Sequence, residues 1–189
     1  MKTLCLRAVL VTLMMVTSAA AHELQENRAT LVLRDKTHVS VTLYIAYSDA
    51  LYLALMPQRP FAAFLLIYSA MKPEDLQKEL FRAQAKFQAA TRMYLSPGPG
   101  REVPITNWVW PDVQQVQTML QQRMMAAMVD PKGHSHEAPV EIRADANSPH
   151  EINAVTVKFP EEFQKVLVVS YRPNQVWADS QGLSPEIKF

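Results

Sequence analysis

Hydrophobic and polar residues alternate along His38–Tyr47, and this pattern predicts a β-strand. The apolar positions are Val39, Val41, Leu43 and Ile45, each separated from the next by one polar or half-polar residue. A period of two is typical of a strand with one buried face. A shorter apolar run, Thr30–Arg34, precedes it, and Asp35-Lys36 between them suits a turn. We therefore expect a β-hairpin near the start of the chain.

Helical periodicity follows in the middle of the chain. Lys72–Ala90 and Pro111–Val129 each carry apolar residues spaced three and four apart, which places them on one helix face. These residues are Leu76, Leu80, Ala83, Phe87 and Ala90 in the first segment, and Val113, Val116, Leu120, Met124 and Ala127 in the second. Asp49–Met56 suits a short helix. The dense apolar run Phe61–Met71 fits a buried helix better than a strand, although its pattern leaves both open.

Further strands are expected on both sides of the second helix. They are Thr91–Leu95 and Glu102–Trp108 around the turn residues Pro97–Gly100, then Pro139–Ala144, Ile152–Phe159, Val166–Tyr171 and a short Val176–Trp177. Asp145–His150 reads as a polar turn and Pro160–Gln164 as a short helical link. The expected fold is α+β, an antiparallel sheet or sandwich of N- and C-terminal strands with a central helical segment packed on it.

Residues 1–21 have the three parts of a secretory signal. Lys2 and Arg7 supply positive charge, Ala8–Val16 is apolar, and Ala19 and Ala21 match the small-residue pattern that a signal peptidase cleaves. The apolar run is too short to span a membrane, and Cys5 precedes it, which does not fit a lipid-attachment site. We expect cleavage at Ala21/His22, with Ala20/Ala21 as the next choice, and a single periplasmic domain over residues 22–189.

Charge limits the classes of partner that we expect, and cysteine content limits the disulfides that the chain can form. The chain has 19 basic and 18 acidic residues, and because two of the basic ones lie in the leader, residues 22–189 carry a formal charge of −1. A near-neutral surface argues against nucleic acid or an anionic membrane as the main partner. The single cysteine, Cys5, leaves with the leader. No internal disulfide is then available, although the periplasm would permit one.

The mature N-terminus is the strongest candidate for chemistry. Cleavage before His22 would free an α-amine beside an imidazole, and the two nitrogens can chelate Cu(II), Ni(II) or Zn(II). His134 and His136 form an H-x-H pair that could complete the site, and His38 and His150 are further candidates. The alternative is that His22 is accidental and that the H-x-H pair belongs to a solvated turn.

Two other residue groups invite a functional interpretation. Met119, Met124, Met125 and Met128 cluster on one expected helix, and thioethers bind Cu(I), but methionine is also ordinary core filling, which we favour here. Trp108, Trp110 and Trp177 could shape a ligand groove or partner surface. Burial at a sheet edge or at the start of a helix is the alternative that we prefer for these aromatic residues.

The sequence holds no signature of catalysis. It has no G-x-S-x-G motif, no cysteine beyond the leader, no phosphate-binding glycine loop, and no carboxylates paired at a suggestive spacing. We do not expect an enzyme.

The mature start, Ala21-His22-Glu23-Leu24, leads into the strand Thr30–Arg34, and Val166–Tyr171 with Pro173 follows near the end. With these segments the chain resembles the extracytoplasmic N-terminal domain of HupE/UreJ-type membrane proteins. The resemblance implies a role in nickel or cobalt supply, and of the site residues it carries over His22. Those proteins continue into several membrane helices, whereas this sequence stops at Phe189.

Two functional hypotheses follow from these patterns. The leading one is a soluble periplasmic binding or accessory module that uses its sheet and aromatic surface to contact a membrane or envelope protein. The alternative is a periplasmic metal-binding protein for Cu or Ni, in which His22 acts with His134, His136 or His38.

Overall fold

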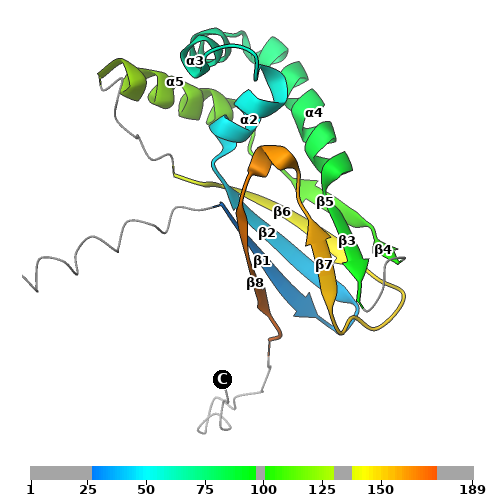
Figure 1. Cartoon of the computed structure of the whole chain (residues 1–189). Coiled ribbons are helices and arrows are strands. Elements are labelled where there is room, and N and C mark those ends of the chain that lie inside the picture. Colours follow the sequence, from blue (N-terminus) through cyan, green and yellow to red (C-terminus); the bar gives the residue numbers. More distant parts are fainter. Residues whose placement is uncertain (1–26, 97–100, 130–137, 174–189) are drawn as a thin grey trace, which may run out of the picture.

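The computed structural model of the chain describes residues 27–96, 101–129 and 138–173 (Figure 1). Its helices are α2 (Tyr47–Leu55), α3 (Phe61–Ser69), α4 (Pro73–Ala90), α5 (Val113–Val129) and the short 3-10 helix η2 (Glu161–Phe163). Its strands are β1 (Asn27–Arg34), β2 (His38–Ile45), β3 (Arg92–Leu95), β4 (Glu102–Val103), β5 (Ile105–Val109), β6 (Val140–Asn147), β7 (Val155–Lys158) and β8 (Val166–Tyr171). These elements confirm the α+β fold class.

Sheet A has five strands in the order β5-β6-β2-β1-β8. The predicted hairpin is its centre, since β1 and β2 pair antiparallel from Arg28↔Tyr44 to Arg34↔His38. Asp35–Thr37 forms the turn, in which Asp35 and Lys36 have φ of 46° and 56°, a left-handed conformation that suits a tight hairpin. The expectation of a purely antiparallel sheet is wrong at one edge, because β8 runs parallel to β1.

Sheet B has three strands in the order β4-β3-β7. Its presence corrects the prediction of a single strand over Glu102–Trp108. Pro104 divides that segment, so that β4 pairs with β3 in sheet B while β5 pairs with β6 in sheet A. The physical reason is that proline has no N–H to donate to a ladder and fixes φ, which ends the first pairing.

Strand β6 is longer than its apolar run predicts. Asp145, Ala146 and Asn147, expected in a polar turn, continue the strand because β2 offers them partners as far as Asn147↔His38. Alternation persists through this segment, with Ile142, Ala144 and Ala146 buried. Strand β7 is shorter than predicted and covers Val155–Lys158.

The helices gather at one end of the two sheets (Figure 1). The predicted apolar face of α4 is buried at Leu76, Leu80, Ala83 and Phe87, as expected. Phe61–Ser69 is a helix, which settles the open choice for that segment. The buried residues of both sheets and of helices α2, α3, α4 and α5 belong to one hydrophobic cluster. Of the helices within the described ranges, none has the length and apolarity to cross a membrane.

Candidate functional site

The predicted site residues divide into two groups. His22, His134, His136 and Trp177 lie outside the described residues, as does the short strand expected at Val176–Trp177. His38, Trp108 and Trp110 lie within them; the two tryptophans lie together, whereas His38 belongs to a separate polar network. The described part of the chain contains no cluster of three or more His, Cys, Asp or Glu side chains that could hold a metal ion.

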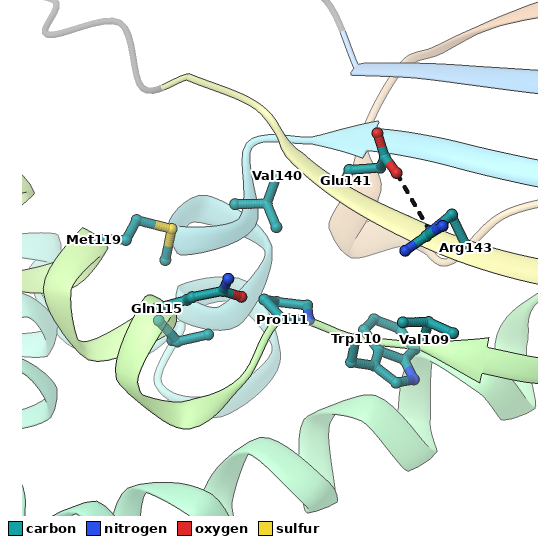
Figure 2. A pocket seen from close by; sticks show the side chains of 9 residues that line it. Val109, Trp110, Pro111, Gln115, Met119, Val140, Glu141 and Arg143 are labelled. Atoms are coloured by element: carbon teal, nitrogen blue, oxygen red, sulfur yellow. Dashed lines mark ion pairs between the residues drawn. The ribbon is translucent and has the colours of Figure 1, made fainter.

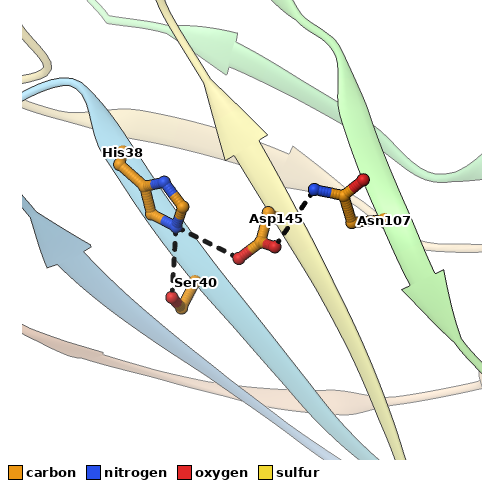
Figure 3. A network of polar contacts seen from close by, with 4 residues as sticks. All are labelled: His38, Ser40, Asn107 and Asp145. Carbon is orange, nitrogen blue, oxygen red and sulfur yellow. Dashed lines mark hydrogen bonds and ion pairs between the residues drawn. The ribbon is translucent and has the colours of Figure 1, made fainter.

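His38 belongs to a polar network on the outer face of sheet A (Figure 3). Its Nε2 lies 3.1 Å from Oδ1 of Asp145 and 3.3 Å from Oγ of Ser40. Asn107 donates from Nδ2 to the other carboxylate oxygen of Asp145, at 3.4 Å. Asn107 sits at an irregularity between β5 and β6 with φ of 53°, a conformation that asparagine tolerates better than most residues. The network therefore spans β2, β6 and β5.

The geometry of this network is not that of a nucleophilic triad. A triad needs the carboxylate on one ring nitrogen and the hydroxyl on the other, whereas Asp145 and Ser40 share Nε2 of His38. What the network does supply is an imidazole oriented by a carboxylate. Figure 3 shows Nδ1 on the other side of that ring.

Trp108 and Trp110 stack on one another ahead of α5, with ring centroids 5.4 Å apart and planes at 13°. Trp110 also packs against Tyr47 and Phe87, at 6.2 and 6.1 Å between centroids. Both tryptophans are half-buried. Trp108 donates from Nε1 to the carbonyl oxygen of Ile105, while Nε1 of Trp110 is buried without a partner among the described residues. Their arrangement is that of aromatic packing beneath the start of a helix.

Trp110 also lines a crevice of about 480 Å³ between α5 and the sheet (Figure 2). The wall from α5 includes Val116 and Met119, and the wall from β6 carries the ion pair between Glu141 and Arg143, at 3.4 Å. In Figure 2 the indole nitrogen of Trp110 points away from the crevice. The crevice thus offers apolar side chains and one exposed ion pair, without a buried polar group directed into it.

Tyr47 is the most perturbed ionisable group in this region. Burial raises the pKa of its hydroxyl far above the ordinary range, and nearby Gln84 opposes that shift weakly. The hydroxyl has no hydrogen-bond partner of good geometry within the described ranges. Tyr47 therefore remains protonated and serves packing between α2, α4 and the tryptophan pair.

Sequence analysis missed an exposed apolar region on two adjacent helices. We call it the α3–α5 surface, and it consists of Leu66, Ile67, Met125, Met128 and Val129, which are between 46% and 87% exposed. Our assignment of the methionines to the core is wrong for Met125 and Met128. Leu120, by contrast, is fully buried, and Met119 and Met124 pack against the core.

The two helices of this surface lie side by side and antiparallel. Gln117 and Gln121 of α5 donate to the carbonyl oxygens of Met71 and Ser69, at 2.8 and 3.2 Å. Arg123, further along α5, lies over the ring of Phe61 at the start of α3. Met125 and Met128 follow Arg123 along α5 and therefore lie toward the beginning of α3. The sequence feature that could have revealed this surface is a lack of charge, because α3 and α5 together contain only one charged residue, Arg123.

That arginine contributes little to the exposed charge. Its guanidinium lies 3.1 Å from Oδ1 of Asp49 in α2, and the side chain is 17% exposed. The α3–α5 surface is thus an apolar, nearly uncharged face at the helical end of the molecule.

Comparison of the chain with protein-family models, with curated proteins and with solved structures gives no match.

Proposed function

We propose that this protein is an exported binding or accessory module that docks onto a membrane or envelope protein through the α3–α5 surface. The observation that carries the proposal is the exposure of five large apolar side chains on two packed helices. Groups of large exposed apolar residues mark interaction sites more often than scattered single residues do. Methionine is well suited to such a surface because its flexible, polarisable side chain adapts to a partner.

The charge pattern favours a protein partner over a lipid surface. Helices that bind membranes at the interface carry lysines and arginines that attract anionic headgroups. The α3–α5 surface lacks them, because Arg123 is turned to Asp49. A charge-free face is complemented best by another charge-free face, such as the exposed side of a helix in an envelope protein.

Site-specific photocrosslinking in cells tests this docking. A photoreactive phenylalanine analogue at Met128 or Leu66 should join the protein to one envelope protein. The matched control is Phe81, an isolated apolar side chain on the charged helix α4 that is 61% exposed. The same analogue at Phe81 should give no such product.

Binding by purified components makes the test decisive. The captured protein should bind the purified chain directly, and Leu66→Glu or Met128→Glu should weaken that binding at least tenfold while Phe81→Glu leaves it unchanged. Equal weakening by Phe81→Glu, or binding of the chain to protein-free vesicles instead, would contradict the proposal.

A second candidate function is periplasmic binding of Cu or Ni, and one observation favours it. Asp145 orients the imidazole of His38 as carboxylates orient histidine ligands in metal sites. The mature N-terminal His22 and the His134/His136 pair would supply the other nitrogens. The resemblance to HupE/UreJ-type domains supports the same role through His22.

Calorimetric titration of the exported protein with Cu(II) and Ni(II) separates the two functions. Stoichiometric binding that is lost in His22→Ala and weakened in His38→Ala supports the metal site. Binding that is equal in the parent and both variants, or absent in all three, rejects it and leaves the docking proposal untouched.

A further inference from the structure

Strand β8 forms one edge of sheet A, and no strand of the described residues pairs with its outer side. Such an edge presents unpaired backbone N–H and C=O groups, and proteins usually protect it with charges, prolines or a bulge. β8 has none of these. Its sequence VLVVSY is uncharged, and its register with β1 runs without interruption from Asn27↔Val166 to Val32↔Tyr171.

The side chains of β8 are also unusually exposed for apolar residues. Leu167 and Val168 are each 47% exposed and Tyr171 is 58% exposed. Partners in register lie on the same face, so Leu167 and Tyr171 lie on the outer face with Arg28 and Val32, and Val168 lies on the core side with Ala29. Both faces of the edge thus carry apolar area.

The opposite edge of sheet A is protected. β5 carries an irregularity in its pairing with β6 between Thr106 and Val109, and Asn107 there has a left-handed backbone. A distorted edge strand is a poor template for another strand. The two edges of one sheet therefore differ in their capacity to pair.

We propose that β8 pairs antiparallel with β8 of a second copy of this chain, joining two A sheets into one continuous sheet. Most homo-oligomers are two-fold symmetric dimers, in which the same surface is used twice. A two-fold axis perpendicular to the sheet places the outer faces of both copies on the same side. Residues opposite each other must then point to the same face. The axis therefore lies beside one residue of β8, which is opposite the same residue of the second copy, and not between two neighbouring residues.

Of these registers, the one with the axis at Val169 pairs the exposed side chains best. It places Leu167 opposite Tyr171 of the second copy, twice, so that the two exposed outer-face residues cover each other. It also places Val168 opposite Ser170 and Arg172 opposite Val166. No like charges meet across the pair, which is the condition for a strand to pair with itself. This dimer uses a different part of the molecule from the α3–α5 surface.

Disulfide scanning tests both the pairing and its register. Cys5→Ser removes the one native thiol, and single cysteines are then placed at positions 166 to 170. Opposed residues of an antiparallel pair have Cα atoms about 4.5–5.5 Å apart, within the range that a disulfide spans. We expect the highest yield of oxidised dimer for Val169→Cys. Val109→Cys, on the other edge of sheet A, is the control and should give none.

Sedimentation of the exported protein over a range of concentrations measures the equilibrium. A small edge-to-edge contact predicts weak, concentration-dependent dimerisation. Leu167→Lys should raise the dimer dissociation constant at least tenfold, while Val109→Lys, a similarly exposed apolar residue, should not change it. Thermal melts of each variant establish that a lost dimer is not a lost fold.

Three results would overturn the inference. They are a monomer at every concentration, disulfide yields that are equal at all positions or highest away from Val169, and a chain truncated after Pro173 that dimerises when the full chain does not. The last result would mean that residues 174–189 cover β8 in place of a second copy.

Discussion

The side chain of Asn27 donates from Nδ2 to the carbonyl oxygen of Phe163, 2.6 Å away and 136 positions later in the sequence. Its Oδ1 accepts from the backbone N–H of Ala46 at 2.8 Å. One amide thus joins the start of β1 to η2 and to the junction between β2 and α2.

Asn27→Ala should lower the free energy of unfolding by about 1–3 kcal/mol, because it leaves a partly buried donor and acceptor without partners. Asn27→Asp keeps the acceptor for Ala46 but sets a carboxylate oxygen against the carbonyl oxygen of Phe163, so it should also lower the free energy of unfolding. Chemical denaturation measures both. Asn147→Ala, an exposed asparagine at the end of β6, is the control, and an equal loss there would contradict the role of Asn27.

Removal of the Tyr47 hydroxyl should cost almost nothing. The hydroxyl is buried and has no partner of good geometry within the described ranges, so Tyr47→Phe should change the free energy of unfolding by less than about 0.5 kcal/mol or increase it. Tyr47→Ala should lower it by about 3–5 kcal/mol, since the ring is fully buried beside Phe87 and Trp110. A large loss in Tyr47→Phe would reveal a hydrogen bond, with Gln84 the nearest candidate.

The ion pair between Lys86 and Glu162, at 2.6 Å, predicts a pH dependence. Burial raises the pKa of Glu162, but the hydrogen bond and charge of Lys86 outweigh it, so that the pKa lies below its usual value. A carboxyl with a lowered pKa stabilises the fold above its unfolded pKa, and the effect is lost as the pH falls through the folded value. Lys86→Met should therefore cost about 0.5–1 kcal/mol at pH 7.

The difference between this variant and the parent should shrink as the pH falls below the usual glutamate pKa, and vanish once Glu162 is protonated in the folded state as well. Urea titrations at several pH values measure the convergence. Lys78→Met is the control, because Lys78 and Asp75 form an exposed pair one helix turn apart, and it should show no comparable change. A loss in Lys86→Met that does not decrease as the pH is lowered would mean that packing of the lysine stem is responsible.

Processing of the leader is predicted to give a protein that begins at His22. Intact mass measurement of protein recovered from the cell envelope should lack residues 1–21. Ala21→Arg, which places a large charged side chain where the peptidase requires a small one, should abolish cleavage before His22. Met1 still present on the unaltered protein would contradict both the periplasmic location and the N-terminal metal chelate.

Local patterns predicted the fold well where neighbouring residues decide it. The alternation in Val39–Ile45 correctly predicted which side of that strand faces the core. The three- and four-residue spacing did the same for the helix with Leu76, Leu80, Ala83 and Phe87. The failures involve distant pairing. Nothing near Pro104 indicates that the chain changes sheets there, and Asp145 to Asn147 form a strand because β2, over 100 residues earlier, supplies partners.

The candidate site was less predictable for a related reason. The choice of His38 by residue type did not reveal its bond to Asp145, which depends on the register of β2 and β6. Met125 and Met128 were assigned to the core because their helix has an apolar face. Met124 and Ala127 on that face do pack against the core, whereas Met125 and Met128 are exposed beside it, so residue type and position in the helix did not decide which methionines are buried.

The parallel pairing of β1 with β8 has a consequence for how the chain acquires its structure. The first strand of the described fold cannot pair with the last until the chain between them has been synthesised. Asn27 and its partner Val166 lie nearly 140 residues apart, so their pairing closes a long loop. Pairing between strands so far apart in the sequence slows folding, because the entropy of closing the long loop is lost before the contacts that offset it can form. The edge strand β8 is therefore the last strand of sheet A to find its partner during synthesis.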